Sequence, residues 1–144
     1  MVRAIFVTWA LCVSALAMAQ SRVERYAVWE VSFDAAGAAA NPYSAITADA
    51  TFTLPGGRTR SIPLFWDGGR QWKLRVSPDT IGRWSYTVRS NDAALNRKTG
   101  DFTCIDSNRA GGLRPMPSAP SHFQRQNGPP VWFLADTAWG YLTD

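Results

Sequence analysis

Hydrophobic and polar residues alternate through most of the chain between positions 25 and 105. Every second residue is apolar in each alternating segment, which predicts strands with one face against a core and the other in solvent. No segment of this region has the period of an amphipathic helix. The predicted strands are 26–33, 45–54, 62–66, 71–76, 83–90 and 101–105.

Turn-forming residues separate the predicted strands. They occur as Asn41-Pro42, Pro55-Gly56-Gly57, Asp67-Gly68-Gly69, Ser77-Pro78-Asp79 and Asn91-Asp92. Many short strands with tight turns, each with one apolar face, need a second sheet to cover that face. The fold class is therefore predicted to be all-β, as an immunoglobulin-like antiparallel β-sandwich.

The apolar faces also predict the core. Trp29, Trp72 and Trp84 fall on these faces, and Cys104 is expected to be a buried thiol. After the Pro-Asp turn, Trp84 and Tyr86 resemble a sandwich corner in which a Tyr hydroxyl bonds the backbone. Trp66 precedes a glycine-rich turn, and two interpretations of it stay open, core packing and stacking on a sugar.

The N-terminus has the pattern of a secretory signal peptide. Residues 1–19 contain one positive charge, Arg3, then an apolar run, and end in the A-x-A pattern Ala17-Met18-Ala19. Cleavage after Ala19 would also remove Cys12 and leave Cys104 alone, so an internal disulfide is excluded. We expect an exported protein, periplasmic or extracellular, with no membrane segment after signal cleavage.

The chain changes character after the last predicted strand of the sandwich, which is assigned to residues 20–107. Residues 108–121 are rich in Pro and Gly and are predicted to be an inter-domain linker. Within 122–144, Asn127-Gly128 predicts a hairpin turn. The apolar run 131–135 predicts a strand buried on both faces, and 122–144 is expected to be the first hairpin and strand of a truncated (β/α)8 barrel.

Two residues at the end of that run are candidate sugar ligands. Asp136 ends the predicted strand and Trp139 follows it, at the position where barrel enzymes carry their binding loops. A carboxylate can accept hydrogen bonds from vicinal hydroxyls, and an indole can stack on the apolar face of a sugar ring. The alternative, that Asp136 or Thr137 caps a helix starting at Ala138, stays open.

The remaining polar residues indicate little further chemistry. Lys73, Arg75, Arg83 and Arg89 are placed on the polar faces of two adjacent strands, as a solvated face or as a docking surface for a further domain. Glu30 is expected to be a surface or ion-paired acid. His122 is the single histidine, which makes a poor metal site. No cofactor is predicted, and scattered positive charge gives no support for nucleic-acid binding.

Several short motifs recur in order along the predicted sandwich. They include Val23-Glu24-Arg25-Tyr26, Asn41-Pro42-Tyr43, Phe65-Trp66-Asp67-Gly68-Gly69, Gly82-Arg83-Trp84-Ser85-Tyr86 and Thr99-Gly100-Asp101-Phe102. Together they resemble the sandwich family called domain of unknown function 5060. The later motifs His122-Phe123, Asn127-Gly128-Pro129-Pro130 and Leu134-Ala135-Asp136-Thr137-Ala138-Trp139 resemble the start of a barrel family, domain of unknown function 4038, which is similar to apiosidase-type glycoside hydrolases.

The resemblance implies an accessory sandwich packed on a glycoside hydrolase barrel that acts on plant-type polysaccharide. It also implies that Asp136 and Trp139 line the sugar pocket, whereas the two catalytic carboxylates would come from later strands. The fragment itself is then expected to be inactive, with carbohydrate bound through the missing barrel and the sandwich docked on it. The alternative is a non-catalytic carbohydrate-binding or structural, docking β-sandwich.

Overall fold

The structure is a computed structural model, and it describes residues 21–133. Eleven strands and one short helix make up this part of the chain. The predicted signal peptide, residues 1–19, lies outside the described residues, and so do Asp136 and Trp139. No helix in the described part is long and apolar enough to cross a membrane.

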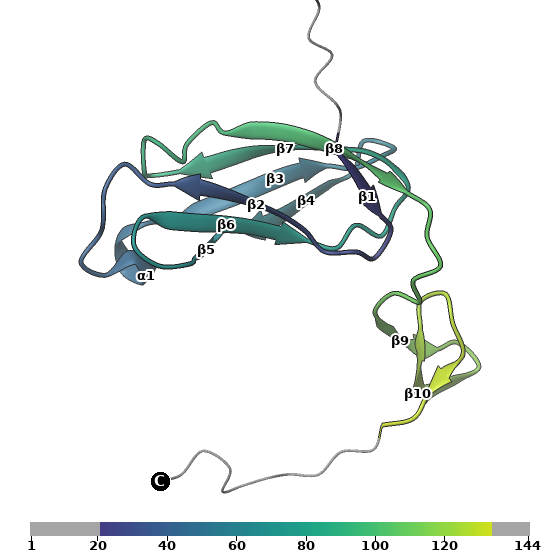
Figure 1. Ribbon diagram of the computed structural model, residues 1–144. Coiled ribbons are helices and arrows are strands. Elements are labelled where there is room, and N and C mark those ends of the chain that lie inside the picture. Colours follow the sequence, from purple (N-terminus) through teal and green to yellow (C-terminus); the bar gives the residue numbers. More distant parts are fainter. Residues whose placement is uncertain (1–20, 134–144) are drawn as a thin grey trace, which may run out of the picture.

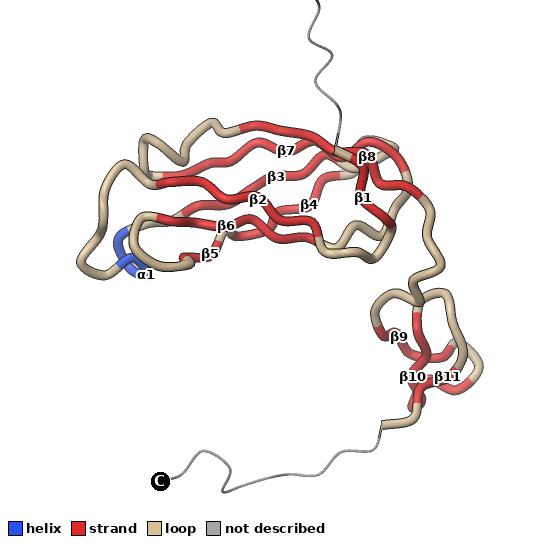
Figure 2. The backbone as a smooth tube through the Cα atoms, viewed as in Figure 1, coloured by secondary structure: helices blue, strands red, loops and turns tan. Residues whose placement is uncertain are grey.

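Two sheets face each other and form the sandwich seen in Figure 1. The first sheet has five strands in the order β1-β8-β7-β3-β4, with bounds Arg22–Glu24, Thr99–Ile105, Gly82–Ser90, Ala48–Thr53 and Thr59–Pro63. The second has three strands in the order β2-β6-β5, with bounds Trp29–Asp34, Gln71–Val76 and Phe65–Trp66. The one helix, α1 (Pro42–Ala45), lies beside β5 at one end of the sandwich (Figures 1 and 2). The predicted all-β sandwich is confirmed.

Most of the core is made of residues that the alternating pattern placed inside, whereas the buried residues Val23, Ala35 and Leu95 lie outside the predicted strands. Trp84, Phe52 and Phe102 have no exposed surface, and Trp72 is 5% exposed. Trp84 stacks on Phe102 with ring centroids 5.9 Å apart and an interplanar angle of 15°. Cys104 is a buried free thiol, as predicted. Across the two sheets, Trp29 of β2 packs against Phe102 of β8 with ring centroids 4.7 Å apart, so aromatic contacts also join the two sheets.

Two strands differ from the prediction. The segment 62–66 is not one strand, because β4 ends at Pro63 in one sheet and β5 begins at Phe65 in the other. Leu64 makes the crossing, and its N–H still donates to the Ala48 carbonyl at 2.9 Å. The strand β1 was missed, and it pairs with β8 in parallel, so the sandwich is not entirely antiparallel. β1 has only three residues and lies at a sheet edge, so its alternation of apolar and polar residues is too short to predict a strand.

The predicted corner exists, but a different side chain makes its hydrogen bond. The Trp84 indole N–H donates to the Thr80 carbonyl at 2.8 Å. Tyr86 instead leans across the neighbouring strand toward Gly100. Both rings face the core, so alternation alone could not tell which polar atom reaches the backbone.

The four basic residues do not share a surface, contrary to the prediction. Lys73 and Arg75 lie on β6, whereas Arg83 and Arg89 lie on β7. These strands follow each other in the sequence but belong to different sheets. The polar faces of the two sheets point away from each other in a sandwich, so the residues form two separate groups.

The end of the described chain forms a small three-stranded sheet, apart from the sandwich in Figure 2. Its order is β11-β10-β9, with bounds Pro130–Val131, Ala119–Arg125 and Leu113–Met116. The hairpin predicted at Asn127-Gly128 is present, since β10 and β11 pair in antiparallel register. β9 and the start of β10 fall in the stretch 108–121 that was predicted to be a linker.

The predicted buried strand 131–135 is not seen in its described part. Only Val131 is in β11, and Trp132 and Phe133 are 94% and 58% exposed. Among the described residues nothing covers the Trp132 side chain, whereas a strand buried on both faces needs covering layers.

Candidate functional site

An aromatic groove opens where α1 meets the end of β5. Its volume is about 490 Å³, and its lining includes Tyr43, Ile46, Asp49, Leu64, Trp66 and Trp72. The rings of Tyr43 and Trp66 are nearly perpendicular, with centroids 5.4 Å apart and an interplanar angle of 83°. Tyr43 is 77% exposed. The two near-perpendicular rings and the buried residues beside them therefore line an open groove.

The orientation of Trp66 follows from the turn that succeeds it. Its indole N–H donates to the Gly69 carbonyl at 3.0 Å. Gly68 and Gly69 have φ angles of 107° and 54°, which favour glycine, and the turn closes between Asp67 and Gln71. Trp66 is half-buried, with one part packed against the core. The glycine-rich turn thus fixes a partly exposed indole in one orientation.

The sequence identified Trp66 but not its neighbours in the groove. Tyr43 comes from α1, which Pro42 begins and in which the Ile46 N–H donates to the Pro42 carbonyl. Proline at the first helical position is a known start signal, and it was available in Asn41-Pro42. Asp49 lies on the polar face of β3. The alternating pattern predicts that such a side chain is exposed, but not that it lines a groove.

The outer face of the β2-β6-β5 sheet carries an ion-pair network. Glu30 binds Arg75 at 2.6 Å and Lys73 at 3.3 Å, and Lys73 also contacts Asp67 at 2.6 Å. The hydrogen bond from Arg75 is the main reason that the pKa of Glu30 is lowered, and that from Asp67 raises the pKa of Lys73. Glu30 is therefore an ion-paired acid, as predicted.

A second carboxylate with a shifted pKa, Asp79, lies in the loop between β6 and β7. Burial pushes the pKa of Asp79 upward, but hydrogen bonds from Arg60 and Thr80 outweigh it, so the pKa is lowered. A general acid needs a raised pKa, and Glu30 and Asp79 both shift the other way. These two carboxylates act as ion-pair partners within the sandwich.

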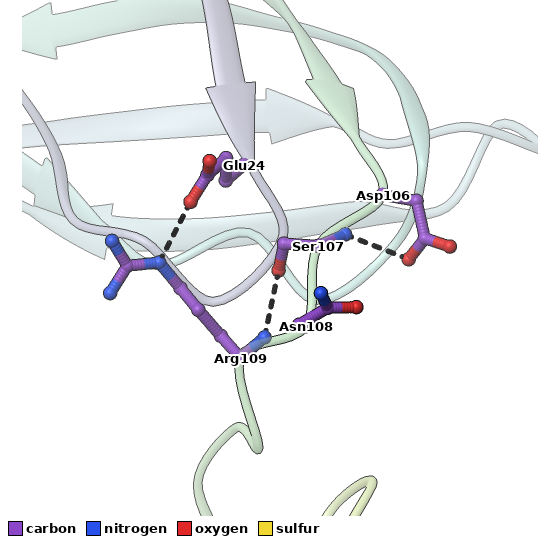
Figure 3. A pocket seen from close by; sticks show the side chains of 5 residues that line it. All are labelled: Glu24, Asp106, Ser107, Asn108 and Arg109. Atoms are coloured by element: carbon purple, nitrogen blue, oxygen red, sulfur yellow. Dashed lines mark hydrogen bonds and ion pairs between the residues drawn. The ribbon is translucent and has the colours of Figure 1, made fainter.

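An open polar pocket of about 690 Å³ lies where the sandwich meets the segment leading to β9 (Figure 3). Arg109 donates to Glu24 at 3.0 Å, and the Ser107 hydroxyl donates to the Arg25 carbonyl at 2.6 Å. Figure 3 shows the ion pair between Arg109 and Glu24, which joins the segment after β8 to β1. The residues that line this pocket therefore connect β1 to the chain after β8.

An apolar patch is exposed on the small sheet. Phe123 and Phe133 are in edge-to-face contact with centroids 5.6 Å apart, and a shallow pocket of about 200 Å³ adjoins them. Trp132 lines the same pocket. Within residues 21–133, no three His, Cys, Asp or Glu side chains are grouped so that they could hold a metal ion.

Comparison with known proteins finds similarity to one protein family. The family described as "Domain of unknown function (DUF5060)" matches residues 22–91, which include β1 to β7 and the aromatic groove. No curated protein is detectably similar to the chain in sequence.

The fold is similar to part of a solved structure. That protein, from Bacteroides vulgatus, bears the description "putative glycoside hydrolase". The two chains superpose with a TM-score of 0.66 and 25% sequence identity, over 78% of this chain. The chain spans only 22% of the length of that protein.

Proposed function

We propose that this chain is the N-terminal accessory β-sandwich of an exported glycoside hydrolase that acts on plant-type polysaccharide. The observation that carries the proposal is the structural similarity, which takes in 78% of this chain but only 22% of a much longer protein described as a "putative glycoside hydrolase". Domains typically have about 50–250 residues, so a sandwich of this size can be one domain of a longer enzyme.

The geometry of the sandwich supports an accessory role. Glycoside hydrolysis uses a pair of carboxyl groups flanking the scissile bond, one of which acts as an acid. Glu30 and Asp79 instead have lowered pKa values because they are held by cations. The ion pair between Arg109 and Glu24 connects the chain after β8 to β1. This contact supports the idea that the sandwich fixes the direction in which the chain leaves it.

The proposal includes three statements about residues outside 21–133. Residues 1–19 direct export and are removed, and Asp136 with Trp139 contacts the sugar. The catalytic barrel takes carbohydrate as its partner and docks on the sandwich. The alternative is a sandwich that binds carbohydrate or serves as a structural or docking domain with no hydrolase attached.

Reading the genomic frame beyond Asp144 tests the proposal. An open frame of about 250 residues, enough for a (β/α)8 barrel with strand-end Asp and Glu, is expected. The protein made from that frame should release reducing sugar from plant cell-wall polysaccharide, and the 144-residue chain alone should not. A well-supported stop codon directly after Asp144 would overturn the proposal in favour of the alternative.

Two variants of the longer protein test the sugar ligands. Trp139→Ala and Asp136→Asn should raise KM more than they lower kcat, because these residues are proposed to bind the ring rather than to break the bond. Sequencing the secreted protein from its N-terminus should give Gln20 as the first residue. Unchanged KM in both variants would remove Asp136 and Trp139 from the proposal.

A further inference from the structure

We infer that the aromatic groove formed by Tyr43, Trp66 and Asp49 is a binding site for a neutral oligosaccharide. This inference concerns the sandwich itself. It names the site and the ligand class for a carbohydrate-binding sandwich, and it would hold whether or not a hydrolase barrel is attached.

The perpendicular rings make the groove suitable for an amphipathic ring. Tyr43 and Trp66 both line the groove, and their rings meet at 83°. The face of an aromatic ring is electron-rich and attracts the C–H groups on the apolar side of a sugar. The volume of about 490 Å³ is within the range of ordinary ligand sites, about 300–1,000 Å³. The groove can therefore hold sugar residues and not only solvent.

The polar rim supplies the second requirement for sugar recognition. Asp49 lines the groove. Among the described residues, its carboxylate takes part in no side-chain hydrogen bond or ion pair, although Arg89 stands opposite it in the register of β3 and β7. Most other acids of the sandwich, including Glu24, Glu30 and Asp79, have a cation partner. An unpaired carboxylate beside two aromatic rings can accept hydrogen bonds from two sugar hydroxyls.

The groove is also held in place before any ligand arrives. Asn91, the residue after β7, accepts from the Thr47 N–H at 2.9 Å and donates to the Ala45 carbonyl at 2.8 Å. The Ser90 hydroxyl donates to the Thr47 carbonyl at 2.7 Å. These bonds fix the segment that follows α1 and hence the position of Tyr43. A preformed site loses less conformational entropy on binding.

The charge of the rim determines which sugars fit. A uronic acid would bring a second carboxylate close to Asp49, and like charges at short distance repel. Neutral sugars carry hydroxyls that a carboxylate can bind without this cost. We therefore expect neutral oligosaccharides to bind in the groove and acidic ones to bind more weakly.

Isothermal titration of the full 144-residue chain with cellohexaose and with xylohexaose tests the inference, with tetragalacturonate as the acidic comparator. We expect at least one neutral oligosaccharide to bind, and tetragalacturonate to bind more weakly. Tyr43→Ala and Asp49→Asn should each raise Kd about tenfold, as expected for the loss of one aromatic contact or one charge-assisted hydrogen bond. Tyr43 and Asp49 are exposed, so both variants should keep the circular dichroism spectrum of the parent.

Matched controls separate the groove from other exposed side chains. Trp132→Ala removes a Trp that is 94% exposed on the small sheet, and Asp34→Asn removes an exposed carboxylate at the end of β2. Both should leave Kd unchanged. The inference is overturned if neither neutral oligosaccharide binds, if Tyr43→Ala and Asp49→Asn bind like the parent, or if tetragalacturonate binds most tightly. If a longer protein bound no sugar and its Tyr43 side chain were buried, the groove would be a contact between domains and the inference would be overturned.

Discussion

The Tyr86 ring lies directly across Gly100 on the neighbouring strand. A Cβ added at Gly100 would come within 2.5 Å of the Tyr86 hydroxyl oxygen and within 2.8 Å of its ring carbons. The two residues are cross-strand partners in the pairing of β7 with β8. Gly100 therefore leaves the space that the phenol ring occupies, an arrangement in which an aromatic ring covers a glycine in a sheet.

We predict that Gly100→Ala destabilises the sandwich. The added methyl must displace a ring that is 6% exposed and packed against Trp29 and Phe52. Overpacking of this kind costs about 1–3 kcal/mol. Urea unfolding followed by Trp fluorescence measures the change. Gly37→Ala is the matched control, because a Cβ there meets nothing within 4 Å. Equal stability of the two variants would contradict the packing argument.

The junction between the sandwich and the small sheet depends on Gly111. Its φ of 77° favours glycine, and a Cβ there would lie 3.0 Å from both the Tyr26 ring and Gln126. Gly111→Ala should cost about 1–3 kcal/mol of local strain and loosen the small sheet without unfolding the sandwich. The N–H groups of Gln126 and Asn127, which bind the carbonyls of Gly112 and Ala110, should lose protection from hydrogen exchange.

Gly112→Ala provides the neighbouring control for this experiment, because a Cβ there meets nothing within 4 Å. It should leave the exchange of Gln126 and Asn127 unchanged. If Gly111→Ala also leaves them protected, the junction does not depend on the contact with Tyr26.

Stability should fall in acid because of Glu30. Its pKa in the folded state is lowered from the ordinary value of 4.5, mainly by the hydrogen bond from Arg75. The folded state thus favours the charged form, so this stabilisation is present above about pH 4.5 and is lost as the pH falls through the lowered pKa. Glu30→Gln should be less stable than the parent at neutral pH and should converge with it in acid.

Thermal unfolding from neutral pH down to about pH 3 measures this dependence. Asp34→Asn, on the same strand, is the control and should follow the parent curve. A Glu30→Gln curve that runs parallel to the parent at every pH would show that the ion pair is not linked to folding.

Cys104 should react only when the fold opens. The side chain is 1% exposed, and burial is the main reason that the pKa of its thiol is raised, so both access and thiolate content are low. In a Cys12→Ser background, Ellman's reagent should label Cys104 slowly in native buffer and at once in denaturant. Rapid labelling of the native protein would contradict the buried position.

The alternating pattern predicted most of the core. Trp72, Leu74 and Val76 on β6 and their counterparts on β7 are buried, because alternation along a strand records which face meets the core. The pattern did not reveal β1, whose three residues at a sheet edge have a parallel partner. It also gave no sign that Tyr43 and Asp49 lie with Trp66, since they are distant in sequence and belong to different elements.

The sequence alone determined that this protein is an all-β sandwich with an aromatic core and a buried thiol, because each strand carries its inner face in its own residues. The tertiary structure decided which strands share a sheet. It separated Lys73 and Arg75 from Arg83 and Arg89, and it moved the chain from one sheet to the other at Leu64. It also brought Tyr43, Asp49 and Trp66 to one groove. Alternation reports only the two sides of a strand, whereas the partners of a strand are set by packing between distant segments.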